Sequence, residues 1–161
     1  MKKLVCMLFA CLLLVGCGAK ETFEVISDGY ESPVAEPRQV VCRLPEEATA
    51  QTIQSDYGQL YFCDGYEIAL QTMPSGDLDK TLRELTGFGK EDITVISTGT
   101  ENTSRYDLVW TAAGEGGDMV GRAAVLDDGN YHYCMTVMAS QENAATLRET
   151  WRSLFESFIL G

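Results

Sequence analysis

Four successive strand-like segments joined by short connections dominate the second half of the chain. They span residues 93–98, 106–112, 119–126 and 131–139, and the connections are rich in turn residues such as Gly114-Glu115-Gly116-Gly117. Parallel neighbours need a crossover of about a dozen residues or more, so connections this short force antiparallel pairing. The sequence therefore predicts an antiparallel meander.

A hairpin and one further strand precede the meander. Asp64-Gly65 separates the strand-like residues 59–63 from 66–73, and this dipeptide favours a two-residue type I′ turn. Val40 to Leu44 is a short apolar run that ends at Pro45, which discourages continuation of a strand. We therefore expect a sheet of about six to seven strands.

Two helices complete the pattern. The first has Ser75 or Asp77 as its N-cap and stops at Gly87, and the second is a long amphipathic helix capped by Ser140. The apolar stripes are Leu78, Leu82 and Leu85 in the first, and Ala144, Leu147, Trp151, Leu154, Phe155 and Phe158 in the second. The second stripe needs a sheet to bury its aromatic residues. The predicted fold class is α+β, with the short helix inserted and the C-terminal helix packed on the sheet.

The N-terminus has the organisation of a secretion signal. Met1-Lys2-Lys3 precedes an apolar run over residues 4–15, which is too short to cross a membrane as a helix. Leu14-Val15-Gly16-Cys17 resembles the lipobox of bacterial lipoproteins, which implies cleavage between Gly16 and Cys17 and lipidation of Cys17. Several acyl chains on one cysteine anchor a protein stably. We expect a lipid-anchored protein on the extracytoplasmic face of the cell membrane.

This interpretation divides the chain into three parts. Residues 1–16 are the signal peptide, residues 17–37 are the lipidated cysteine and an acidic tether, and residues 38–161 form one globular domain. Within the tether, residues 23–26 contain enough apolar side chains for one short edge strand. Removal of the signal leaves 12 − 2 = 10 basic against 24 acidic residues, a net charge of −14. Such a charge argues against nucleic acid as a partner.

The candidate metal or thiol-redox residues lie in strand-like segments. Alternation along the strand from Tyr131 places His132 and Cys134 on one face, and Cys42 and Cys63 are further soft ligands for Cu or Zn²⁺ if folding brings them close. The alternative is a strand buried on both faces, in which these side chains fill the core. The three domain cysteines allow one disulfide at most.

No catalytic set is predicted. The chain contains one histidine, no Gly-x-Ser-x-Gly elbow and no Cys-x-x-Cys motif, so we expect no enzyme and no cofactor. A hydrolase with paired carboxylates stays open as an alternative. Tyrosine suits recognition surfaces, and Tyr61, Tyr66, Tyr131 and Tyr133 are the candidate partner surface if one sheet face is partly open.

The order of elements resembles the photosystem II protein PsbP and its bacterial lipoprotein relatives. The residues that carry the resemblance are the strand Tyr66–Met73, the helix after Asp77, Gly121-Arg122-Ala123, the strand from Tyr131, and Trp151 to Phe158. The resemblance covers residues 38–160 and implies an α/β/α sandwich with a binding or assembly-helper role at a membrane, without common catalytic residues. The leading prediction is a non-enzymatic module for a protein or another envelope component.

Overall fold

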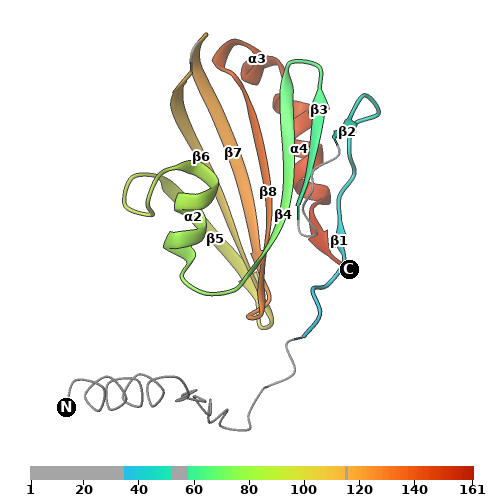
Figure 1. Cartoon of the computed structure of the whole chain (residues 1–161), viewed down its shortest axis with the longest axis vertical. Coiled ribbons are helices and arrows are strands. Elements are labelled where there is room, and N and C mark those ends of the chain that lie inside the picture. Colours follow the sequence, from blue (N-terminus) through green and yellow to red (C-terminus); the bar gives the residue numbers. More distant parts are fainter. Residues whose placement is uncertain (1–34, 52–57, 115) are drawn as a thin grey trace, which may run out of the picture. The chain divides into compact units, whose positions relative to one another are not determined.

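The computed structural model describes residues 35–51, 58–114 and 116–161. Its main sheet is a seven-stranded antiparallel sheet in the order β2-β3-β4-β8-β7-β6-β5 (Figure 1). The strands are β2 (Thr49–Gln51), β3 (Gly58–Cys63), β4 (Tyr66–Pro74), β5 (Thr94–Thr100), β6 (Thr103–Gly114), β7 (Gly117–Asp127) and β8 (Tyr131–Ser140). The predicted meander and strand number are confirmed.

The hairpin of β3 and β4 closes at Asp64-Gly65, where Cys63 pairs with Tyr66. Gly65 has a φ of 80°, but Asp64 does not have a positive φ. A type I′ turn needs a positive φ at both central residues, so the predicted turn type is wrong although the hairpin itself is confirmed. One left-handed residue, supplied by glycine, is sufficient for this turn.

The inserted helix, α2 (Leu78–Thr86), begins and ends through local contacts. The Asp77 side chain accepts a hydrogen bond from the backbone N–H of Asp79 at 3.0 Å, which identifies Asp77 as the N-cap. Gly87 at the C-terminus has a φ of 80° and donates its N–H to the Arg83 carbonyl at 2.9 Å. Leu82 from the predicted stripe is fully buried.

The predicted long C-terminal helix is two helices, α3 (Gln141–Thr146) and α4 (Arg148–Ser157). Ser140 caps the first as expected, since its hydroxyl accepts a hydrogen bond from the Asn143 N–H at 3.3 Å. The Thr146 hydroxyl donates to the Asn143 carbonyl, which also accepts the Leu147 N–H. A threonine that competes for a helical carbonyl favours a bend, and Leu147, with ψ near 3°, separates the two helices here.

A small second ladder joins the two ends of the described domain. β1 (Val40–Val41) pairs antiparallel with β9 (Ile159–Leu160). β1 is shorter than the predicted strand, and neither β9 nor β2 was predicted, because segments of two or three residues have no periodic pattern of their own. The signal peptide, Cys17 and the possible strand at residues 23–26 lie outside the described residues.

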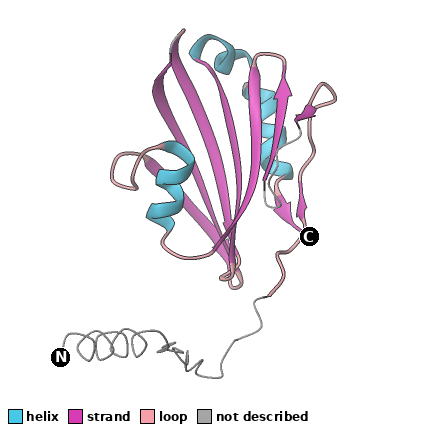
Figure 2. Ribbon diagram, in the orientation of Figure 1, coloured by secondary structure: helices cyan, strands magenta, loops and turns pink. Residues whose placement is uncertain are grey.

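The main sheet lies between two helical layers (Figure 2). The α2 face is the side of the sheet on which Leu82 packs against Leu108, Trp110, Ala123, Val125 and Cys134. The α4 face is the opposite side, where Trp151, Leu154, Phe155 and Phe158 pack against Ile68, Ala124, Tyr133, Met135 and Val137. The arrangement is an α/β/α sandwich, and β8 is covered on both sides.

Candidate functional site

Strand β8 alternates as the sequence predicts. The core of the α4 face includes every second residue of the strand: 131, 133, 135, 137 and 139. The core of the α2 face includes Cys134 and Met138. His132 and Cys134 are 0% and 1% exposed. The interpretation of this segment as a strand buried on both faces is confirmed, and its unusual side chains fill the core.

The four candidate tyrosines do not form an open surface. Tyr66 and Tyr133 are 4% and 0% exposed, and Tyr61 and Tyr131 are partly buried against the same cluster. This candidate surface required a partly open sheet face, and α3, α4 and the segment from Val40 to Leu44 cover the face on which these rings lie. The Tyr133 hydroxyl accepts the Arg38 N–H at 2.8 Å and donates to the Asp128 carboxylate at 2.9 Å. The Tyr133 hydroxyl therefore forms hydrogen bonds within the domain that stabilise the fold.

The sheet separates the candidate metal ligands. Cys42 and Cys63 lie on the α4 face, whereas Cys134 lies on the α2 face, and all three are free thiols. Within the described ranges, no three His, Cys, Asp or Glu side chains are grouped closely enough to hold a metal ion. The condition for a shared metal site, that folding brings His132 and the three cysteines together, is therefore not met in the described residues.

The environments of the thiols also oppose redox chemistry. Burial raises the pKa of Cys134 to about 12, with a smaller contribution from Glu84. Burial raises the pKa of Cys42 as well, although a hydrogen bond with Ser157 acts in the opposite direction. The Cys42 thiol donates to the Met135 sulfur at 3.7 Å, a contact within the core. A thiol with a raised pKa is a poor nucleophile, because the thiolate is the reactive form.

His132 belongs to a buried polar cluster that the sequence did not indicate. Its Nδ1 lies 2.8 Å from the Thr81 hydroxyl, and its Nε2 lies 3.5 Å from an Asp127 carboxylate oxygen. The other oxygen of Asp127 accepts hydrogen bonds from Ser75 and from the Gly129 N–H. His132 is fully buried and Thr81 is 6% exposed, so a substrate does not reach the pair. The cluster ties the first turns of α2 to β7 and β8.

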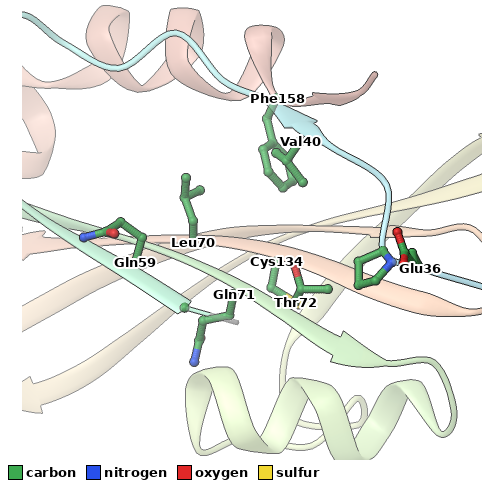
Figure 3. A pocket seen from close by; sticks show the side chains of 10 residues that line it. Glu36, Val40, Gln59, Leu70, Gln71, Thr72, Cys134 and Phe158 are labelled. Atoms are coloured by element: carbon green, nitrogen blue, oxygen red, sulfur yellow. The ribbon is translucent and has the colours of Figure 1, made fainter. Parts of the chain in front are cut away.

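An open groove of about 500 Å³ is the best candidate for a binding site (Figure 3). It lies between the N-terminal segment of the domain and the strands β3 and β4. We call these lining residues the groove: Glu36, Pro37, Val40, Gly58, Gln59, Leu70, Gln71, Thr72, Cys134 and Phe158.

Polar and apolar side chains share the lining of the groove about equally. Leu70 rises from the sheet toward Val40 and Phe158, and Gln59 lies on the strand beside that of Leu70 (Figure 3). Glu36 is the one charged residue among the lining residues. Such a mixed surface suits a small amphipathic group. The Gln59 amide nitrogen donates to the Gln51 carbonyl at 2.6 Å. The sequence did not indicate the groove, because its lining residues come from four distant parts of the chain: the segment 36–40, the β3–β4 hairpin, β8 and the end of α4.

The domain gives no sign of a membrane span: in the part of the chain that the structure describes, every helix is too short or too polar to cross a bilayer. No family model matches the sequence. No curated protein matches it either.

Solved structures are similar in fold. The cyanobacterial PsbP of Synechocystis is similar with a TM-score of 0.59 and 8% identity, over 76% of this chain and 86% of that one. A protein from Bacteroides thetaiotaomicron has a TM-score of 0.51 and 9% identity, over 76% of this chain and 45% of that one. LpqN of Mycobacterium tuberculosis, described as involved in cell envelope biogenesis, has 12% identity over 78% and 86% of the two chains, with a TM-score of 0.49. The chain thus has a PsbP-like α+β fold.

Proposed function

We propose that this protein is a lipid-anchored, non-enzymatic binding or accessory module on the extracytoplasmic face of the cell membrane, with a protein or another envelope component as its partner. Cys17 after Leu14-Val15-Gly16 supports the anchor. The PsbP-like fold fits an accessory or binding module. The burial of His132 and the separation of the three cysteines support a role without catalysis or redox chemistry.

The observation that carries the binding role is the position of the groove beside the start of the domain. Glu36 and Pro37 line it, and they follow Cys17 by only 19 and 20 residues (36 − 17 and 37 − 17). A fully extended chain of this length spans at most about 70 Å, and a flexible one about 25 Å on average. A partner held in the groove would therefore lie close to the membrane surface.

The chemistry of the groove limits the kind of contact. Leu70 and Val40 are partly buried and offer some apolar area, while Phe158 is 1% exposed and closes the bottom of the groove. The one carboxylate, Glu36, disfavours an anionic group. An uncharged segment of the partner with one apolar side chain fits these properties. Burial of one such side chain contributes about 1.5–3 kcal/mol, which supports moderate affinity when further contacts surround it.

Site-specific photocrosslinking in native membranes tests the binding role. A photoreactive residue replaces Gln59 in the full chain, and a matched variant carries it at Arg152, which is 62% exposed on α4. We expect a discrete crosslinked product from position 59 that Leu70→Asp abolishes, and none from position 152. Equal products at both positions, or a product insensitive to Leu70→Asp in a folded protein, would contradict binding in the groove.

A separate experiment tests the anchor. Cells that express the full chain or Cys17→Ser are labelled with a clickable palmitate analogue and fractionated. We expect label and membrane association for the natural sequence, and loss of both for Cys17→Ser. Label that persists in Cys17→Ser would remove the anchor from the proposal and leave the groove experiment unaffected.

A further inference from the structure

Strand β5 forms a long open edge of the main sheet. It is the last strand in the sheet order and pairs with β6 along Thr94–Thr100. Six of its seven residues are exposed, and its sequence, Thr-Val-Ile-Ser-Thr-Gly-Thr, contains no charge and no proline. Backbone N–H and C=O groups that point outward from an edge strand can pair with a further strand. Proteins usually protect such an edge with lysine, proline or a bulge, and β5 contains no lysine and no proline.

The opposite edge of the sheet is different. Strand β2 contains three residues and pairs with only the central part of β3. A strand of three residues offers too few backbone groups for stable addition of another strand. Among the residues that the structure describes, β5 is therefore the long edge strand of the sheet.

An apolar pair lies beside this edge. Ile96 is 61% exposed and Val109 on β6 is 54% exposed. Thr94 pairs with Val109 and Ile96 pairs with Asp107, which makes Ile96 and Val109 diagonal neighbours on one side of the sheet. That side is the α4 face, since Asp107 pairs with Ala124 of its core. An added strand would extend this apolar pair and cover Ile96.

Charge indicates the kind of strand that would fit. Asp92 before β5 and Glu101 after it are both exposed, and no basic residue lies within the strand. The whole chain has a net charge of −12. A second copy would bring the same charge, and repulsion opposes its approach. A cationic segment is attracted to both ends of the edge.

We propose that β5 binds an extended cationic segment of a partner protein, which adds as an eighth strand, places an apolar side chain beside Ile96 and carries Lys or Arg near its ends. Recognition of this kind takes its affinity from main-chain hydrogen bonds and its specificity from alternate side chains. The surface is separate from the groove, and the inference depends on neither the groove nor the anchor.

Binding of synthetic peptides to the full-length protein, solubilised in detergent, tests this proposal. The probe is the capped peptide Lys-Thr-Val-Thr-Ile-Thr-Val-Thr-Lys, with two matched peptides: one has Glu at both ends, and the other has alternate backbone nitrogens methylated. We expect the lysine peptide to bind at least about tenfold more tightly than either, with slowed amide exchange at residues 94–100. Higher salt should reduce the difference between the Lys and Glu peptides, because exposed charges are screened.

Two protein variants complete the test. Ile96→Lys should weaken binding of the lysine peptide at least about tenfold, while Val41→Lys, at a residue 47% exposed on the β1–β9 ladder, should leave it unchanged. Equal affinity for all three peptides, exchange protection elsewhere, or equal effects of both variants would overturn the proposal. A concentration-dependent dimer that Ile96→Lys dissociates would identify a second copy as the occupant and also overturn it.

Discussion

Arg105 links the end of α4 to the sheet by hydrogen bonds, and its replacement tests how strongly these bonds stabilise the packing of α4 on the sheet. From β6, its guanidinium donates to the carbonyls of Phe155 and Phe158, each at 3.0 Å. It also forms two hydrogen bonds with the Asp107 carboxylate, at 2.7 and 3.0 Å. Carbonyls at a helix C-terminus lack partners within the helix, so a fixed cation is favourable there.

The expected cost follows from these contacts. The two hydrogen bonds to the carbonyls at the end of α4 contribute about 1.5–3 kcal/mol each. The pair with Asp107 is partly exposed and adds little, and the 22% exposure of the Arg105 side chain lets water replace part of the total. We expect Arg105→Ala to lower the free energy of unfolding by about 3 kcal/mol and the melting temperature by roughly 10 °C. Arg105→Lys keeps the charge but not the planar group of donors, so about half of that loss is expected.

Urea denaturation of the three proteins measures these differences. Arg152→Ala is the matched control, since Arg152 pairs with Glu149 on the exposed side of α4 and should cost less than about 0.5 kcal/mol. The m-value should stay constant, because the same surface unfolds. If Arg105→Ala costs no more than Arg152→Ala, the reasoning that Arg105 holds α4 on the sheet is refuted.

Three further predictions concern the core and the turns. Gly121→Ala should cost about 1–3 kcal/mol and shift tryptophan fluorescence, because a Cβ there would clash with the Trp110 ring; unchanged stability and emission would contradict this. Cys134, with a pKa of about 12, should resist maleimide at pH 8 until denaturant is added, whereas the partly exposed Cys63 should react first in a mass spectrum. Burial acts to raise the pKa of Asp128, but hydrogen bonds from Tyr131, Asn130 and Tyr133 outweigh it and lower the pKa. The stability from this shift is present above the unfolded pKa of about 4 and is lost as pH falls through the folded value, so Asp128→Asn should cost much less at pH 2.5 than at pH 7 in thermal melts.

Local signals in the sequence predicted the elements well. Gly87 and Ser140 act on backbone groups within four residues of themselves, so their neighbours in the chain are sufficient to identify them as caps. For the start of α2 the sequence left Ser75 and Asp77 as alternatives, and the structure selects Asp77. Alternation along β8 likewise depends only on the period of a strand. The face that each residue occupies was therefore predictable.

Features that depend on distant pairing were not predictable in this way. Val40 pairs with Leu160, and Thr81 meets His132 only where α2 packs on the sheet. Tyrosine is suited equally to a wet surface and to a core, so the burial of Tyr66 and Tyr133 depended on which face α4 covers. The groove has the same origin, because Leu70 and Phe158 become neighbours only after the sheet and α4 have formed. The anchor at Cys17 stays a prediction.

The β1–β9 ladder holds the first and last residues of the described domain side by side. Gly161 donates its N–H to the Gln39 carbonyl at 2.8 Å, and Arg38 donates to the Gly161 carbonyl at 2.8 Å. Domains whose ends meet tolerate circular permutation and insertion into a host loop. Joining the ends and opening the β6–β7 turn at Gly116 should therefore preserve the sheet order. A protein fused after Gly161 would emerge beside the residues that lead back toward the N-terminus, leaving the opposite end of the sandwich, with α3 and the β3–β4 turn, unobstructed.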